Sequence, residues 1–134
     1  MMSLQDAARA LVSHDMRASG TERCDGVGTD SRALVPGQLF VALRGERFDG
    51  HDFVTTAAKM GAAAALVDAR WFADNPAPAL PVVVVDDTRL ALGTLAAAWR
   101  ARFALPLIGV TGSNGKTTVK EMCAAILRAQ ARSE

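Results

Sequence analysis

Four consecutive valines at 82–85 constrain the fold of this 134-residue chain more than any other feature. Successive side chains of a β-strand point to opposite faces of the sheet, so an unbroken apolar run needs apolar cover on both sides. Such strands are typical of parallel or mixed sheets that carry helices on their faces. The run therefore predicts an α/β fold.

Other apolar segments alternate with helical patterns at lengths that agree with this fold class. Strands are predicted at 38–43, 63–67, 81–85 and 106–110. Helices are predicted after a cap at Ser3, from Asp52 to Gly61, from Asp87 or Thr88 to about Arg102, and from Thr117.

Some details of packing can also be predicted from these patterns. The helix from Asp52 is expected to place Phe53, Ala57 and Met60 on one apolar face and to stop at Gly61 in a left-handed conformation. The segment 68–81 contains three prolines and is expected to be a surface excursion. We expect its two aromatic residues, Trp71 and Phe72, and also Trp99 to pack against the core.

Composition excludes several function classes. The 15 basic and 14 acidic residues leave a net charge of +1, which provides no field to attract nucleic acid or an anionic membrane. The apolar runs are too short or too interrupted to span a bilayer, and Asp6 and Arg9 would interrupt a signal peptide. Cys24 and Cys123 lie far apart without zinc-site spacing. We expect a cytoplasmic protein with buried thiols and no nucleic-acid or membrane partner.

The segment TGSNGKTT at 111–118 is the strongest chemical signal. It stands between a predicted strand and a predicted helix, where glycines and a helix N-terminus direct backbone N–H groups at phosphate oxygens. Lys116 would neutralise β- and γ-phosphates, and the Thr117 hydroxyl would coordinate Mg²⁺. The usual pattern is incomplete, because Val110 stands where its first glycine belongs. The alternative is an ordinary tight turn.

Two segments resemble one family. The string GVTGSNGKTTVKEM at 109–122 resembles the ATP loop of the Mur ligases and their folylpolyglutamate synthetase relatives, and TDSRALVPGQLFVALRGERFDGHDF at 29–53 resembles an N-terminal Mur ligase domain. The resemblance implies a UDP-sugar-binding domain at 1–86. It implies a linking helix and the start of a central ATP-binding domain at 87–134, with only the first strand, phosphate loop and helix of that domain.

The resemblance also implies the roles of individual residues. Lys116 would be catalytic and Thr117 a Mg²⁺ ligand. ATP would contact Thr111, Gly112, Ser113, Asn114, Gly115, Lys116, Thr117 and Thr118. The UDP-sugar would contact Ser31, Arg32, Arg44, Gly45, Arg47, Asp49, Gly50 and His51.

Structural alternatives stay open for several polar residues of the chain. Asp30 and Arg32 could form an ion pair, and Asp49 could be a turn residue. A hydrogen bond that orders the loop is the simpler role for His51, because no nucleophile converges on it in the sequence. Asp86 and Asp87 end a strand and could bind Mg²⁺ or cap the next helix.

The resemblance implies an ATP-dependent ligase of peptidoglycan precursor synthesis that acts through an acyl phosphate. The forms of the two motifs favour the member that adds D-alanyl-D-alanine to UDP-N-acetylmuramoyl-tripeptide. The ligase for the third stem residue and a non-catalytic UDP-sugar-binding module are the alternatives. The other Mg²⁺ ligands and the third domain of such an enzyme are not found in these residues, so we expect the isolated chain to be inactive.

Overall fold

The computed structural model describes residues 2–11, 15–17 and 23–131. It divides into two compact units, Met1–Phe103 and Ala104–Glu134, which we call the N-terminal and C-terminal units. Within the described residues, no helix is both long enough and apolar enough to cross a membrane.

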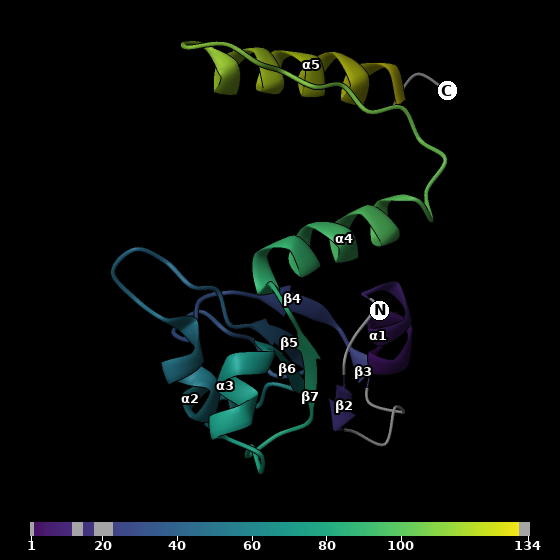
Figure 1. The fold of residues 1–134 in the computed structure, drawn as a ribbon. Helices are drawn as coiled ribbons and strands as arrows, with labels where there is room; N and C mark the ends of the chain where they lie inside the picture. The colour runs from purple at the N-terminus through teal and green to yellow at the C-terminus, as the bar shows by residue number, and fades with distance from the viewer. Residues whose placement is uncertain (1, 12–14, 18–22, 132–134) are drawn as a thin grey trace. The chain divides into compact units, whose positions relative to one another are not determined.

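A five-stranded mixed sheet with the order β2-β7-β6-β5-β4 forms the centre of the N-terminal unit (Figure 1). Its parallel strands are β4 (Gly26–Gly28), β5 (Gln38–Val41), β6 (Ala64–Asp68) and β7 (Val82–Val85). Strand β2 (Asp15–Arg17) runs antiparallel to β7, and β1 (Met2–Ser3) pairs with β3 (Arg23–Cys24) in a separate ladder. The predicted α/β class with a mixed sheet is confirmed.

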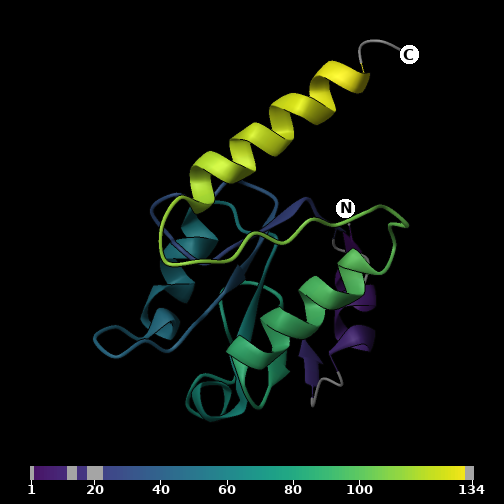
Figure 2. The ribbon, with the colours of Figure 1, turned by 90° about the horizontal axis from the view of Figure 1, so that it is seen from above.

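Helices cover both faces of this sheet. Helices α1 (Leu4–Ala10) and α4 (Thr88–Arg100) lie on one face, and Figure 2 shows them beside each other. Helices α2 (Val54–Lys59) and α3 (Ala69–Asp74) lie on the other face. Alternate side chains of each strand therefore enter opposite halves of the core, with Leu39, Leu66 and Val83 on the first side and Phe40, Val67 and Val84 on the second.

The helix predicted from Asp52 buries only one of its three expected apolar residues, Ala57. It begins as the 3₁₀ turn η1 (Gly50–Phe53) and continues as α2. Within α2, Val54 and Ala57 lie three positions apart on one face of the helix and are buried. Phe53 and Met60 are 40% and 44% exposed. The left-handed stop is confirmed, since Gly61 has φ +86°.

The expectation that segment 68–81 is only a surface excursion is wrong, because the segment contains α3. Asp68 caps this helix by accepting a hydrogen bond from the Trp71 backbone N–H at 2.8 Å. Trp71 and Phe72 pack against the second half of the core, as expected of them. A side-chain cap and two aromatic anchors therefore outweigh the nearby prolines, which all follow the helix.

Side-chain caps fix the starts of α1 and α4 at the predicted positions. Ser3 and Asp6 form a reciprocal capping box at α1. The Asp87 Oδ1 atom accepts hydrogen bonds from the Arg89 and Leu90 backbone N–H groups at 2.8 and 2.9 Å. Capping thus accounts for Asp87 without a metal. Cys24 is buried and Cys123 is partly buried, and neither forms a disulfide.

Helix α4 belongs structurally to the N-terminal unit. Its residues Ala91 and Leu95 are buried in the same half of the core as α1, and the compact unit extends to Phe103. The boundary expected between residues 86 and 87 would instead make this helix a link to the next domain. The functional division into a UDP-sugar-binding part and an ATP-binding part stays a prediction.

The C-terminal unit contains α5 (Lys116–Ala131), which confirms the last predicted helix. The strand predicted at 106–110 does not form in the described structure. A strand requires backbone partners on a neighbouring strand, and the described residues of this unit provide none. Leu107 and Ile108 are accordingly 75% and 62% exposed.

Candidate functional site

Residues 44–51 form a tight loop, here called the 44–51 hairpin. Arg44 and Asp49 pair as an antiparallel bridge, and the Gly45 N–H donates to the Phe48 carbonyl at 2.9 Å. The Gly50 N–H donates to the Leu43 carbonyl at 2.8 Å. A Cβ atom on Gly50 would lie 2.7 Å from the Leu43 nitrogen, so only glycine fits there. The lack of a side chain at Gly50 therefore makes room for the backbone of Leu43 and not for a ligand.

Arg44 holds this hairpin by pairing with two carboxylates. Its Nε atom lies 2.6 Å from Asp68 Oδ2, and its Nη1 atom pairs with Asp49 Oδ2. Burial by itself would raise the pKa of Asp68, but hydrogen bonds from Arg44 and the Trp71 N–H outweigh it, so the pKa lies below the ordinary 3.8. Burial by itself would also raise the pKa of Asp49. Hydrogen bonds from the backbone and the side chain of His51 outweigh it, so the pKa of Asp49 is lowered too.

His51 is buried, with a side chain only 1% exposed, and both of its ring nitrogens are engaged. The Asp68 N–H donates to Nε2 at 3.0 Å, which assigns the ring proton to Nδ1. That nitrogen lies 2.6 Å from Asp49 Oδ1. The imidazole therefore orders the hairpin and has no ring nitrogen left for a ligand, which agrees with the simpler of the two roles considered for it.

The segment 30–32 forms a small ion-paired turn. Asp30 accepts hydrogen bonds from the Arg32 backbone N–H and the Arg32 Nε atom, both at 2.9 Å. These bonds lower the pKa of Asp30 to about 2. The Arg32 side chain is nevertheless 88% exposed, so it is open to a ligand. Ser31 between them is buried. The predicted contact of Ser31 and Arg32 with a UDP-sugar stays a prediction.

A polar cleft of about 450 Å³ opens at the carboxyl ends of β6 and β7. Ligands of open α/β sheets usually bind at this edge of the strands. Of the residues predicted from the sequence for the UDP-sugar, only Arg44 lines the cleft, and Arg47 lies at the exposed turn of the hairpin. The lining residues are Arg44, Asp68, Ala69, Arg70, Asp86, Asp87, Thr88 and Arg89.

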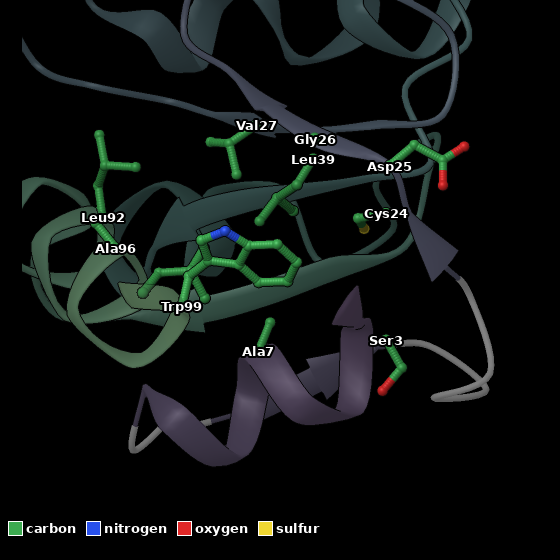
Figure 3. Close-up of a pocket in the computed structure, with 11 residues that line it drawn as sticks. Ser3, Ala7, Cys24, Asp25, Gly26, Val27, Leu39, Leu92, Ala96 and Trp99 are labelled. Carbon is green, nitrogen blue, oxygen red and sulfur yellow. The ribbon is translucent and has the colours of Figure 1, made fainter. Parts of the chain in front are cut away.

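A second cavity, of about 380 Å³, has a different character. It lies among α1, α4, β4 and β5, where Ala7, Val27, Leu39 and Trp99 face one another (Figure 3). No residue predicted for nucleotide or sugar binding lines it. Its mostly apolar wall offers few groups that could bind a charged nucleotide.

The loop before α5 contains two glycines with positive φ. Gly112 and Gly115 have φ values of +145° and +75°, which side chains rarely tolerate. The first N–H groups of a helix have no intrahelical partners. At the start of α5 these groups belong to exposed residues, because residues 111–118 are all exposed. The Lys116 ammonium folds back onto the Gly112 carbonyl and lies 3.4 Å from the Ser113 carbonyl. The loop thus brings together backbone donors and one cation.

The described residues suit one of the two expected ligands, ATP, better than the other, Mg²⁺. The glycine turn, Lys116 and the α5 N-terminus suit a nucleotide's phosphates. No group of three or more His, Cys, Asp or Glu side chains in the described parts of the chain could hold a metal. Thr117 therefore offers a single hydroxyl, and Mg²⁺ would have to arrive with phosphate oxygens as its other ligands.

Sequence reasoning missed Asp68, which the structure places at the centre of the hairpin's contacts. A signal was present, because an aspartate directly after a buried strand and before an aromatic pair is a helix-cap pattern. Its second role, the ion pair with Arg44, joins residues 24 positions apart. No local pattern indicates such a contact.

Two family profiles match the chain in order. The profile described as Mur ligase family, catalytic domain, matches residues 23–100, and the Mur ligase middle domain matches residues 110–133. The first match covers more than half of the chain. It includes the 44–51 hairpin, and the second match includes the loop before α5.

Individual relatives extend this finding. The UDP-N-acetylmuramoyl-tripeptide–D-alanyl-D-alanine ligase of Escherichia coli is 53% identical over 77% of this chain. The UDP-N-acetylmuramoyl-L-alanyl-D-glutamate–2,6-diaminopimelate ligase of Streptomyces coelicolor is 44% identical over 81%. In both cases the chain spans only 22% of the relative.

Solved structures agree with the sequence relatives. MurF from Acinetobacter baumannii matches 95% of this chain with a TM-score of 0.77 and 37% identity, over 27% of its own length. MurF ligase from Thermotoga maritima in complex with ADP matches 81% with a TM-score of 0.61 and 32% identity, over 24% of its length.

Proposed function

The chain belongs to the Mur ligase family, and from this membership we propose that it forms the nucleotide-sugar-binding part and the start of the ATP-binding part of a peptidoglycan precursor ligase. The proposed reaction joins the carboxylate of UDP-N-acetylmuramoyl-tripeptide to the amine of D-alanyl-D-alanine. Relatives named for this reaction support the choice. The chain spans less than a quarter of those two relatives, so the whole reaction is proposed and not assigned.

In this proposal the 44–51 hairpin and the 30–32 turn receive the UDP-sugar. The charged donors for the diphosphate are Arg47 at the exposed turn of the hairpin and Arg32, whose guanidinium is paired with Asp30 but is 88% exposed. Arg44, Asp49, Gly50 and His51 act mainly by fixing the hairpin, because their polar groups are already paired within the protein. Gly45 closes the turn through its N–H bond to the Phe48 carbonyl, and Ser31 is proposed to offer its hydroxyl to the UDP-sugar.

The proposed role of the 111–118 loop is to hold the phosphates of ATP. Backbone N–H groups of 112–118 and the N-terminal end of α5 would bind the phosphate oxygens. Lys116 would leave the Gly112 and Ser113 carbonyls and turn toward the β- and γ-phosphates. The Thr117 hydroxyl is the ligand that this chain offers to Mg²⁺.

The chemistry explains why such a loop is needed. A carboxylate does not acylate an amine at neutral pH, because an oxide ion would have to leave. ATP, when bound, supplies a phosphoryl group that turns the carboxylate oxygen into a better leaving group. Lys116 would stabilise the negative charge on the transferring group, and the loss of such a clamp typically lowers the rate about 100- to 1,000-fold. A cytoplasmic location is part of the same proposal, since UDP-N-acetylmuramoyl-tripeptide and ATP are soluble nucleotides.

One observation carries the proposal, namely that two family profiles match the chain in order over the hairpin and the phosphate-type loop. The test is a pair of calorimetric titrations of this chain, one with UDP-N-acetylmuramoyl-tripeptide and one with Mg-ATP. Arg47→Ala should weaken only the first ligand by about tenfold, because it removes a charged donor. Lys116→Ala should weaken only Mg-ATP.

Arg9→Ala is the matched control, since Arg9 is also exposed but lies on α1, outside the hairpin and outside the polar cleft. Neither titration should change with this variant. The absence of any binding of the UDP-tripeptide to the wild-type chain would contradict the proposal. Binding of the UDP-tripeptide without Mg-ATP would instead support a non-catalytic UDP-sugar-binding module.

The ligase for the third stem residue is the second candidate, supported by the 44% identity to the Streptomyces coelicolor protein. The two candidates differ in the length of the stem peptide on the substrate. Parallel titrations with UDP-N-acetylmuramoyl-dipeptide and UDP-N-acetylmuramoyl-tripeptide separate them wherever the peptide itself contributes to binding. Tighter binding of the dipeptide form would favour the second candidate.

A further inference from the structure

Asp68 occupies an unusual position at the end of β6, where each of its polar groups has a different partner. Its Oδ1 atom accepts the Trp71 N–H at 2.8 Å and caps α3. Its Oδ2 atom accepts Arg44 Nε at 2.6 Å, and its backbone N–H donates to His51 Nε2 at 3.0 Å. The side chain is only 11% exposed. One residue of the sheet thus contacts both ends of the 44–51 hairpin.

The contacts close into a ring. Asp49 pairs with Arg44 Nη1 and with His51 Nδ1 inside the hairpin, and Asp68 contacts the same two residues from the sheet. Of these four residues, Asp68 alone lies outside the hairpin. His51 is 1% exposed, so the ring is shielded from water on that side. The hairpin's position on the sheet therefore depends on Asp68.

We propose that Asp68 is a positioning residue for nucleotide-sugar recognition, which holds Arg44 and His51 so that the 44–51 hairpin presents its exposed turn in one arrangement. This inference rests on the proposed function, because it assumes that the hairpin contacts the UDP part of the substrate. Asp68 does not touch the ligand in this role. Its effect passes through the two hairpin residues that it holds.

Asp68→Asn separates this role from helix capping. Asparagine caps helices about as well as aspartate, so α3 should persist and the far-UV circular dichroism should not change. The negative charge that holds Arg44 is lost. We expect the Gly45 and Gly50 amides to exchange with solvent about three- to tenfold faster, and the affinity for UDP to fall by a similar factor, since a charged hydrogen bond on a half-exposed arginine is lost.

Asp74→Asn is the matched control, because Asp74 lies on the same helix, carries the same charge and is exposed. It should change neither amide exchange nor UDP affinity. Arg44→Ala removes the Arg44–Asp68 contact from the arginine side and leaves the α3 cap intact. If Asp68→Asn does not fold, the exchange rates of the Gly45 and Gly50 amides in Arg44→Ala decide whether this contact positions the hairpin. The double variant Asp68→Asn with Arg44→Ala should bind UDP no more weakly than Arg44→Ala alone.

The two proposals fail in different ways. If wild-type chain does not bind UDP, the proposed function fails, and the amide exchange of the hairpin still decides whether Asp68 positions it. If Asp68→Asn leaves the Gly45 and Gly50 amides and the UDP affinity unchanged, the positioning role is wrong. Additive losses in the double variant would also overturn it, because Asp68 would then act independently of Arg44.

Discussion

The N-terminal and C-terminal units contain the same kind of sequence pattern and reach different structures. Residues 82–85 and 106–110 are both short apolar segments followed by a polar turn and an amphipathic helix. The first segment is β7, which pairs with β6 on one side and β2 on the other. The second has no strand structure. The comparison teaches that an apolar run specifies a strand only where neighbouring strands can accept its backbone hydrogen bonds.

The helices after these segments show the same contrast. Helix α4 buries Ala91 and Leu95 against the sheet. The large apolar residues of α5 are exposed, with Met122 at 60% and Ile126 at 65%. Amphipathic helices gain most of their stability from packing of the apolar face. Helix α4 already has this packing, so α5 depends far more than α4 on a further contact that covers its apolar face.

Amide exchange should show the largest difference between the two segments. The β7 amides of Val83 and Val84 exchange only when the sheet opens, whereas the Leu107 and Ile108 amides have no ladder partners among the described residues. We expect exchange at β7 to be at least about a thousandfold slower, measured by NMR on a chain shown to be monomeric. Equal protection of the two segments would mean that 106–110 is paired in solution.

Leucine truncation should produce the next largest difference. Leu66→Ala removes a fully buried side chain from the centre of β6 and should lower the free energy of unfolding by about 3 kcal/mol. Leu107→Ala is the matched control and should change it by less than about 0.5 kcal/mol. Both tryptophans lie in the N-terminal unit, so their fluorescence in urea reports that unit. Similar losses for both variants would contradict the exposure of Leu107.

Alanine at left-handed glycines should give a smaller contrast. Gly61→Ala forces a φ of +86° on alanine and brings its Cβ atom within 3.2 Å of Pro36, so we expect a loss of about 1–2 kcal/mol in urea unfolding. Gly115 has φ +75°, but a Cβ atom there would meet no heavy atom within 4 Å. Gly115→Ala should leave the tryptophan-detected unfolding curve unchanged and should instead weaken Mg-ATP binding.

Acid should produce the smallest effect, and only through the N-terminal unit. The folded-state pKa values of Asp49 and Asp68 lie below 3.8, so their ion pairs contribute stability above about pH 4, and that contribution is lost as the pH falls through the folded pKa values. The urea midpoint of tryptophan fluorescence should therefore decline between about pH 4 and pH 2. Asp68→Asn should show a shallower decline, and an unchanged slope would mean that Asp68 is not ion-paired in solution.

The last prediction concerns the ligase activity of the chain by itself. The chain by itself should release no phosphate from ATP in the presence of UDP-N-acetylmuramoyl-tripeptide and D-alanyl-D-alanine, because no group of three or more His, Cys, Asp or Glu side chains in the described residues could hold Mg²⁺. A colorimetric phosphate assay checks this. Tripeptide-dependent release by the purified chain would show that the required groups are present.

Local sequence patterns determined much of this protein. The capping residues Ser3 and Asp87, the stop at Gly61 and the doubly buried β7 could each be read from a few neighbouring residues, because caps, left-handed turns and side-chain alternation are short-range effects. The motifs that indicate the Mur ligase family could also be recognised from the sequence, because each is a contiguous string.

Only the tertiary structure decided the rest. Whether 106–110 becomes a strand depends on partners outside the segment, and the face of α2 that is buried is the one that packs against the second half of the core. The contact of Asp68 with Arg44 and His51 joins residues far apart in the chain. Such contacts form when the sheet brings distant backbone segments together, so no pattern of neighbouring residues could have indicated them.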